Sequence, residues 1–108
     1  MSIIVMKFGG TSISNLEKIK NIANRIRREL NKKKKVLVVV SAMGKTTDEL
    51  AKKFFVIKKD IFNAEYDSVI STGEQLSAGL LAAFLDENKI SARSLLGWQI
   101  PIITNGKH

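Results

Sequence analysis

The alternation of apolar and polar positions divides the first third of the chain into a strand, a helix and a second strand. Ser2–Lys7 and Val36–Val40 are short apolar runs with β-branched side chains, so both are predicted to be buried strands. Between them, the spacing of apolar residues predicts a helix over Asn15–Leu30, and Ser14 and Glu17 have the capping-box spacing of a helix start. Its apolar positions are Leu16, Ile19, Ile22, Ala23, Ile26 and Leu30.

The middle of the chain predicts two further helices. Thr46 and Glu49 repeat the capping-box spacing, so a helix is expected to begin near Asp48 and to run toward Lys58. The stretch "STGEQLSAGLLAAFLDENK" predicts a helix over Glu74–Asn88. One face of that helix is expected to carry Leu76, Leu80, Leu81, Phe84 and Leu85.

The end of the chain predicts two short strands, Ala92–Leu96 and Ile100–Thr104, although Pro101 restricts the second to a strand start or a sheet edge. Strands that are apolar throughout and alternate with helices are typical of a parallel sheet covered by helices on both faces. The sequence therefore predicts an α/β fold with three layers, αβα, around a mainly parallel sheet. The carboxyl ends of such strands share one rim, where these folds carry their sites.

Composition narrows the class of protein. The 108 residues suffice for one hydrophobic core, and the 44% of hydrophobic and 26% of charged residues are typical of a globular domain. No cysteine is present, and His108 is the single histidine, so we expect neither a disulfide nor a metal site. No apolar run is long enough to span a membrane or to serve as a signal peptide. We therefore expect a cytoplasmic protein without a membrane partner.

The formal net charge of +8 comes largely from Arg25–Lys35, where seven basic residues face one acidic residue, Glu29. This segment fits the exposed end of a helix, where cations complement the helix dipole. It also fits a surface for nucleic-acid phosphates. We favour the first interpretation and expect no nucleic-acid partner, because no aromatic residues are interleaved with the charges.

The stretch "KFGGTS", which ends the first strand, has the parts of an anion site. Gly9 and Gly10 let main-chain N–H groups approach an anion closely, and Lys7 adds a positive charge. Thr11 and Ser12 add hydroxyl groups, so the stretch could hold a polyphosphate and neutralise a moving phosphoryl group. A plain strand-to-helix turn with a solvated lysine explains the same residues.

Two other stretches are rich in small and polar residues. "SAMGKTTDEL" places Ser41 after the second strand and Thr47 before a helix, which suits a small polar substrate, while capping by Thr46 is the simpler explanation. In "STGEQL", Glu74 could pair with the cationic amine of a substrate. Ser71 and Glu74 also have capping-box spacing, so both interpretations remain open.

Taken together and in this order, "VMKFGGTS", "VVVSAMGKTTDEL" and "STGEQLSAGLLAAFL" resemble the three signatures of aspartokinases. The final stretch, "GWQIPIITNGKH", is similar to the segment that follows in that family, whereas Lys53–Tyr66 resembles nothing that we recognise. Other enzymes of the amino-acid-kinase fold share a lysine and glycines on the first strand but lack the second and third signatures. The resemblance implies the N-terminal half of an amino-acid-kinase fold, like that of carbamate kinase.

The resemblance also implies an activity, the ATP-dependent phosphorylation of the L-aspartate β-carboxylate, which begins lysine, threonine and methionine biosynthesis and, in bacteria, leads to diaminopimelate. ATP would enter with Mg²⁺. By position in the signatures, Lys7 would be catalytic and would bind the ATP phosphates. The other phosphate-binding positions would be Phe8, Gly9, Gly10 and Ser41. Thr47 would contact aspartate, and Glu74 would hold its ammonium group.

Aspartokinases are several times longer than 108 residues. Beyond the matched part they carry an arginine for the substrate carboxylates, a "GRGGSD"-like stretch, the nucleobase-binding half and ACT domains. We therefore expect residues 1–108 to be a partial catalytic domain, inactive alone, with an exposed sheet edge that favours self-association or pairing with a chain that carries the other half. A non-catalytic phosphate- or aspartate-binding module, or one half of a split kinase, is the alternative.

Overall fold

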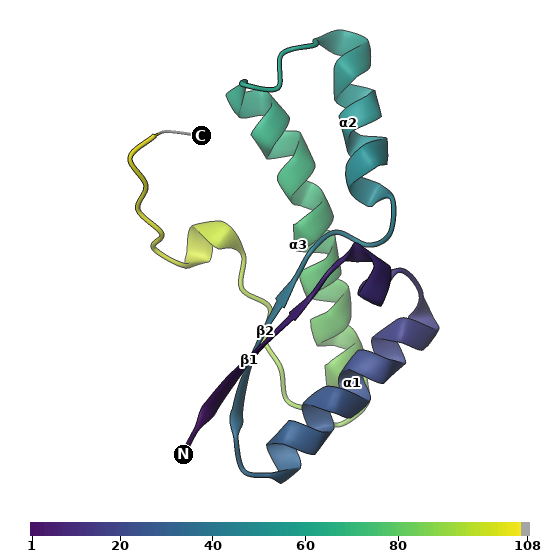
Figure 1. Ribbon diagram of the computed structural model, residues 1–108, viewed down its shortest axis with the longest axis vertical. Helices are drawn as coiled ribbons and strands as arrows, with labels where there is room; N and C mark the ends of the chain where they lie inside the picture. Colours follow the sequence, from purple (N-terminus) through teal and green to yellow (C-terminus); the bar gives the residue numbers. More distant parts are fainter. Residues whose placement is uncertain (107–108) are drawn as a thin grey trace.

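The computed structural model describes residues 1–106 and contains a small parallel sheet with helices (Figure 1). Strands β1 (Ile3–Phe8) and β2 (Lys35–Val40) pair in parallel, with Ile3 opposite Lys35 and Phe8 opposite Val40. Helix α1 (Leu16–Asn31) connects them, so the first part of the chain is a βαβ unit. This confirms the predicted α/β class and both predicted strands: the first lies one residue later than predicted, and the second starts one residue earlier and ends at the predicted residue.

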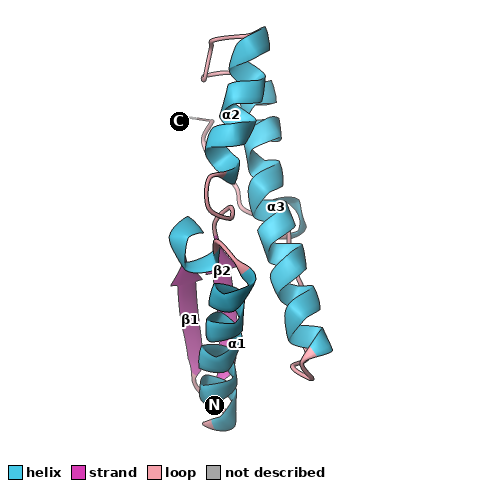
Figure 2. Cartoon of the chain, turned by 90° about the vertical axis from the view of Figure 1, so that its right-hand side faces the viewer, coloured by secondary structure: helices cyan, strands magenta, loops and turns pink. Residues whose placement is uncertain are grey.

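The sheet buries one face and exposes the other. Side chains alternate along a strand, and in β1 Met6 and Phe8 are buried while Ile3 and Val5 are 67% and 62% exposed. In β2, Leu37 is likewise half exposed. Helix α1 and the second half of the long helix α3 (Ala64–Glu87) pack on the buried face (Figure 2). Within residues 1–106 helices therefore cover one face of the sheet rather than the expected two.

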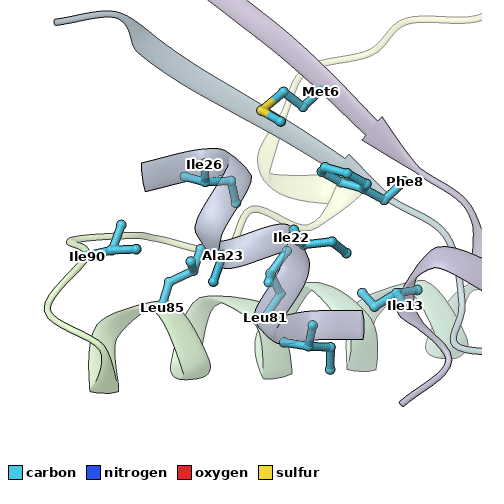
Figure 3. Close-up of a cluster of buried hydrophobic side chains, with 10 residues drawn as sticks. Met6, Phe8, Ile13, Ile22, Ala23, Ile26, Leu81, Leu85 and Ile90 are labelled. Atoms are coloured by element: carbon cyan, nitrogen blue, oxygen red, sulfur yellow. The ribbon is translucent and has the colours of Figure 1, made fainter. Parts of the chain in front are cut away.

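The hydrophobic core lies between the sheet, α1 and α3 (Figure 3). Ile22 and Ile26 of α1 lie between the strands and α3, and Leu81 and Leu85 approach from α3. Ile13, which follows the glycine turn after β1, is fully buried and closes one end of the core. Burial of a large aliphatic side chain contributes about 1.5–3 kcal/mol, so this cluster is the main stabilising feature of the chain.

Helix α1 begins as its pattern predicts, but its cap is a different residue. The side chain of Asn15, not Ser14, is the cap, and its Oδ1 accepts a 2.9 Å hydrogen bond from Lys18 N. Ser14 instead donates its hydroxyl to the Thr11 carbonyl at 3.1 Å. The expected capping box of Ser14 and Glu17 is therefore wrong, because the short helix η1 (Gly10–Ile13) takes Ser14 into its own C-terminal end.

Helix α2 (Thr46–Ile57) begins about where the sequence predicts, and α3 begins much earlier than predicted. The two run side by side (Figure 1), and the rings of Phe54 and Tyr66 meet edge to face at 5.2 Å. Asn63 caps α3 by accepting a 2.8 Å hydrogen bond from Glu65 N. Ser71 and Glu74 therefore lie inside α3, and the predicted capping box at this place is wrong.

The buried side of α3 also differs from the predicted one. Leu81 and Leu85 are buried as expected, whereas Leu76 and Leu80 are 51% and 45% exposed. The buried positions follow every fourth residue along the helix, at Gly73, Ser77, Leu81 and Leu85. The first two of these positions, Gly73 and Ser77, are small, because the N-terminal half of α3 closely approaches the loop after β2.

Residues 92–96 and 100–104 are not strands, so both C-terminal strand predictions are wrong. The chain forms the short helix η2 (Gly97–Gln99), whose neighbours Leu96 and Ile100 are extended, and no residue between 90 and 106 belongs to a strand. Apolar character alone cannot make a strand, because a strand needs a neighbour for its main-chain hydrogen bonds.

Within residues 1–106, no helix is both long and apolar enough to cross a membrane.

Candidate functional site

The carboxyl ends of β1 and β2 lie side by side, which brings together the two stretches that follow them. Ser41 N donates a 3.1 Å hydrogen bond to the Phe8 carbonyl, and the Ser41 hydroxyl lies 3.5 Å from the same oxygen. Gly44 N donates to the Gly10 carbonyl at 3.0 Å. The structure thus confirms that "KFGGTS" and "SAMGKTT" share one rim of the sheet.

Glycine is required where these two stretches meet. A Cβ atom at position 10 would lie 2.9 Å from the Ala42 carbonyl oxygen and 3.3 Å from that of Gly44, which is closer than side chains tolerate. Gly44 itself has a φ of +52°, the left-handed region that glycine adopts without strain. Close packing therefore requires glycine at position 10, whereas a Cβ built at the exposed Gly9 would have nothing within 4 Å.

Lys7 and Phe8 point to opposite faces of the sheet. Lys7 is exposed at the end of β1, on the face without helices. The Phe8 side chain is 5% exposed, and the guanidinium carbon of Arg25 lies 5.4 Å from the centre of its ring. Of the predicted phosphate-binding residues, Phe8 can therefore contribute at the rim through its main chain, whereas Lys7 has a free cationic side chain there.

The third stretch, "STGE", reaches the same place from α3. A Cβ atom at Gly73 would lie 3.0 Å from Ala42 Cβ and 3.3 Å from Thr46 Cγ2. Glu74 follows Gly73 in the helix and is half-buried, and Thr47 follows Thr46 in the first turn of α2 and is also half-buried. The structure therefore brings all three sequence stretches together around one residue, Ala42, which is 3% exposed.

Thr46 is not the cap of α2. Lys45 occupies the cap position without a side-chain hydrogen bond, and Thr46 N donates to the Met43 carbonyl at 2.9 Å. The simpler explanation of Thr46 as the cap is therefore wrong. The Thr46 side chain instead lies toward Gly73, where its Cγ2 would be 3.3 Å from an added Cβ.

Glu74 lines a groove between β2, α3 and residues 90–100, together with Ser71 and Val40. The remaining lining of this groove is mostly apolar, with Leu81, Leu85 and Trp98 among its residues. Lys7 does not line it and belongs to a separate basic groove with Arg25 and Arg28. The cationic and the acidic candidates thus approach the shared rim from different sides.

Three residues near the rim escaped the sequence interpretation. Lys18 Nζ donates a 2.7 Å hydrogen bond to the Thr11 carbonyl and so ties α1 to the loop after the two glycines. Ala42 and Gly73 carry the close contacts described above. Their small size inside polar stretches was a visible signal, but it does not reveal which segments meet.

Within residues 1–106, no group of three or more acidic, histidine or cysteine side chains could hold a metal ion.

Comparison with known proteins decides the family. The amino acid kinase family matches residues 2–107, almost the whole chain. The chain belongs to the amino acid kinase family. Its predicted resemblance to aspartokinases is confirmed by relatives of that name, to which the chain is similar along its full length.

Among these relatives, an aspartokinase of Geobacillus stearothermophilus is 50% identical over 108 residues, and aspartokinase 2 of Bacillus subtilis is 46% identical; each match covers the whole chain and 26% of the relative. The crystal structure of an aspartate kinase from Synechocystis matches 87% of the chain and 16% of its own, with a TM-score of 0.83 and 44% identity. The chain therefore spans about a quarter of the length of the aspartokinases that it resembles.

Proposed function

We propose that the chain provides the phosphate loop and part of the substrate site of an aspartate kinase, which transfers the γ-phosphoryl group of ATP to the β-carboxylate of L-aspartate. The observation that carries this proposal is the meeting of three motif stretches at Ala42, since each contributes groups suited to one part of the reaction. The two named substrates come from the relatives, which are aspartokinases.

In this proposal the rim holds the ATP phosphates. The main-chain N–H groups of Gly9 and Gly10 and the Ser41 hydroxyl donate to phosphate oxygens, and Phe8 takes part through its main chain. Lys7 places its ammonium group beside the γ-phosphate. Catalysis of phosphoryl transfer rests on positioning and on charge stabilisation, so Lys7 neutralises the charge of the phosphoryl group while it moves.

On the acceptor side, Glu74 binds the α-ammonium group of aspartate and Thr47 hydrogen-bonds to the substrate. An oxygen of the β-carboxylate attacks the γ-phosphorus, the bond to the β–γ bridging oxygen breaks, and 4-phospho-L-aspartate and ADP result. Magnesium enters as part of the ATP complex.

The chain has more surface than a complete domain of its size. Its accessible surface is 8064 Å², whereas a compact monomer of this mass exposes about 6,000 Å². The radius of gyration is 15.7 Å, against about 13 Å for a compact domain of this length. We propose that a further part of the kinase covers the open face of the sheet, completes the three-layer αβα domain and supplies the nucleobase pocket.

The proposal is tested in a chimera in which residues 1–108 replace the matching quarter of the Geobacillus stearothermophilus aspartokinase. We expect ATP- and Mg²⁺-dependent formation of aspartyl hydroxamate by the chimera and none by the 108-residue chain alone. Lys7→Ala is expected to lower kcat by at least about a hundredfold, because a charge that stabilises the transition state is removed.

Lys52→Ala is the matched control, since this exposed lysine of α2 lines neither of the two grooves and should leave kcat unchanged. A chimera that folds cooperatively but phosphorylates no aspartate would contradict the proposal. Activity of the 108-residue chain alone, abolished by Lys7→Ala, would show that the part is already complete.

A further inference from the structure

Ala42 is enclosed by the main chain of two other segments. On one side, the Gly10 main chain is so close that a Cβ there would lie 2.9 Å from the Ala42 carbonyl oxygen. On the other side, a Cβ at Gly73 would lie 3.0 Å from Ala42 Cβ. We call the contact of Gly10, Ala42 and Gly73 the Ala42 junction. Ala42 cannot move away from α3, because the proposed phosphate loop, residues 7–12, packs against its other side.

Gly73 does not have the properties of a glycine that is needed for backbone conformation. It lies inside α3, where glycine is less favourable than alanine because it has more main-chain freedom to lose. The close contacts supply a reason for that cost: Ala42 Cβ, Leu50 Cδ1 and Thr46 Cγ2 would all lie within 3.3 Å of an added Cβ. Gly79, six residues later in the same helix, has nothing within 4 Å of a built Cβ.

The residues next to the Ala42 junction are those assigned to the substrate. Glu74 follows Gly73 on α3, and Thr47 follows Thr46 on α2. The separation of α3 from the loop after β2 therefore sets the separation of Glu74 from Thr47. A methyl group at position 73 would force these elements apart by a few tenths of an ångström, and small displacements of positioning groups have large effects on rates and binding.

We infer that Gly73 is a positioning residue for the amino-acid substrate: by its lack of a side chain it sets the distance between Glu74 and Thr47, and the Gly10 main chain behind Ala42 leaves α3 as the element that a larger residue at position 73 would displace. This inference rests on the proposed function. Gly73 touches no substrate and acts through the helix that carries Glu74. The inference predicts weaker aspartate binding when position 73 carries a methyl group.

The test uses the same chimera and four variants. In Gly73→Ala, we expect the KM for aspartate to rise about tenfold because Glu74 and Thr47 are moved apart, while kcat and the KM for ATP stay within about twofold. Gly79→Ala is the matched control, as it adds the same methyl group to the same helix without a contact and should change neither KM.

Rescue separates a steric effect from a general loss of structure. Ala42→Gly removes the methyl group that a side chain at position 73 would meet at 3.0 Å, so the double variant Gly73→Ala with Ala42→Gly should regain most of the aspartate affinity. Ala42→Gly alone should have a smaller effect than Gly73→Ala. Leu50 meets the new methyl group with the flexible end of its side chain, whereas the β-branched Thr46 is stiffer and limits the rescue.

The outcomes distinguish the inference from the proposed function. An active chimera in which Gly73→Ala behaves like Gly79→Ala would overturn the inference and leave the function standing. An equal fall of kcat for all substrates without rescue by Ala42→Gly would also overturn it, because that is the signature of lost structure. A cooperatively folded chimera without aspartate kinase activity would overturn the function, and the inference with it.

Discussion

Single charged side chains in the basic segment 25–35 have local partners. The Glu29 carboxylate lies 3.0 Å from Lys34 Nζ and 3.5 Å from Lys32 Nζ. Arg27 donates a 2.8 Å hydrogen bond to a main-chain carbonyl at the end of α3. These contacts favour the interpretation of the segment as a helix end that is tied to the rest of the fold.

Glu29 makes the stability of the chain depend on pH in a defined direction. The hydrogen bond from Lys34, and secondarily the charge of Lys32, lowers the pKa of the Glu29 carboxyl below its usual value of 4.5. A carboxyl with a lowered folded-state pKa stabilises the fold above its unfolded pKa, and this contribution disappears as the pH falls through the folded pKa. We expect Glu29→Gln to lower the Tm at pH 7 and to have little effect near pH 2.

The measurement is thermal unfolding of the two chains by circular dichroism across this pH range. Glu87→Gln is the control, since Glu87 makes no salt bridge within the described residues, and it should lower the Tm at pH 7 less than Glu29→Gln does. An equal loss of Tm for Glu29→Gln at both pH values would show that the ion pairs contribute nothing and that the side chain acts by packing.

At the scale of elements, side-chain caps fix the first residue of two of the three α-helices. α1 and α3 both start at asparagine side chains, Asn15 and Asn63, that accept main-chain hydrogen bonds. α2 starts at Lys45 without such a bond. Side-chain caps satisfy N–H groups that have no partner inside the helix, so α2 has the weaker start of the three and depends more on its packing against α3.

The cap of α1 can be tested directly. Asn15→Ala removes the 2.9 Å hydrogen bond to Lys18 N, and we expect the free energy of unfolding to fall by about 1 kcal/mol. Ser14→Ala, one residue earlier, should cost less than about 0.5 kcal/mol because this exposed hydroxyl does not cap the helix. Urea unfolding at low protein concentration gives both values, and a larger loss for Ser14→Ala would contradict the assignment of the cap.

At the scale of the whole molecule, apolar side chains remain exposed on one side of the sheet. Ile3, Val5 and Leu37 are at least half exposed on the face without helices, and β1 leaves one edge unpaired within residues 1–106. Exposed apolar faces and open strand edges favour association with other chains. The principal dimensions of 48 × 33 × 18 Å describe a flat body rather than a compact sphere.

We therefore expect the 108-residue chain to self-associate as its concentration rises. Val5→Lys should weaken this association, because it places a charge in the middle of the exposed face. Leu16→Lys is the control, as Leu16 is 58% exposed at the start of α1 and away from that face. Sedimentation velocity over a range of concentrations measures the effect, and a wild-type chain that stays monomeric, or equal association of both variants, would contradict the prediction.

Within the candidate site, sequence reasoning identified the residue types and the shared rim of the first two stretches. It did not predict that Lys7 and Phe8 have different environments, with the Lys7 side chain exposed at the rim and the Phe8 ring buried in the core. Nor did it find Gly73 as a contact, since "STGE" was expected to start a helix. The contact of Gly73 with Ala42 joins residues far apart in the chain, so no local sequence pattern indicates it.

The sequence by itself determined the βαβ unit, because strand and helix periodicity, two glycines and a buried aliphatic stripe all act locally there. Tertiary structure decided the early start of α3, the exposure of Leu76 and Leu80, and the absence of strands between residues 92 and 106. These features depend on which surface packs against which: α3 turns its small residues toward Ala42 because the loop lies there, and residues 92–96 and 100–104 form no strand because a strand exists only beside a hydrogen-bonded neighbour.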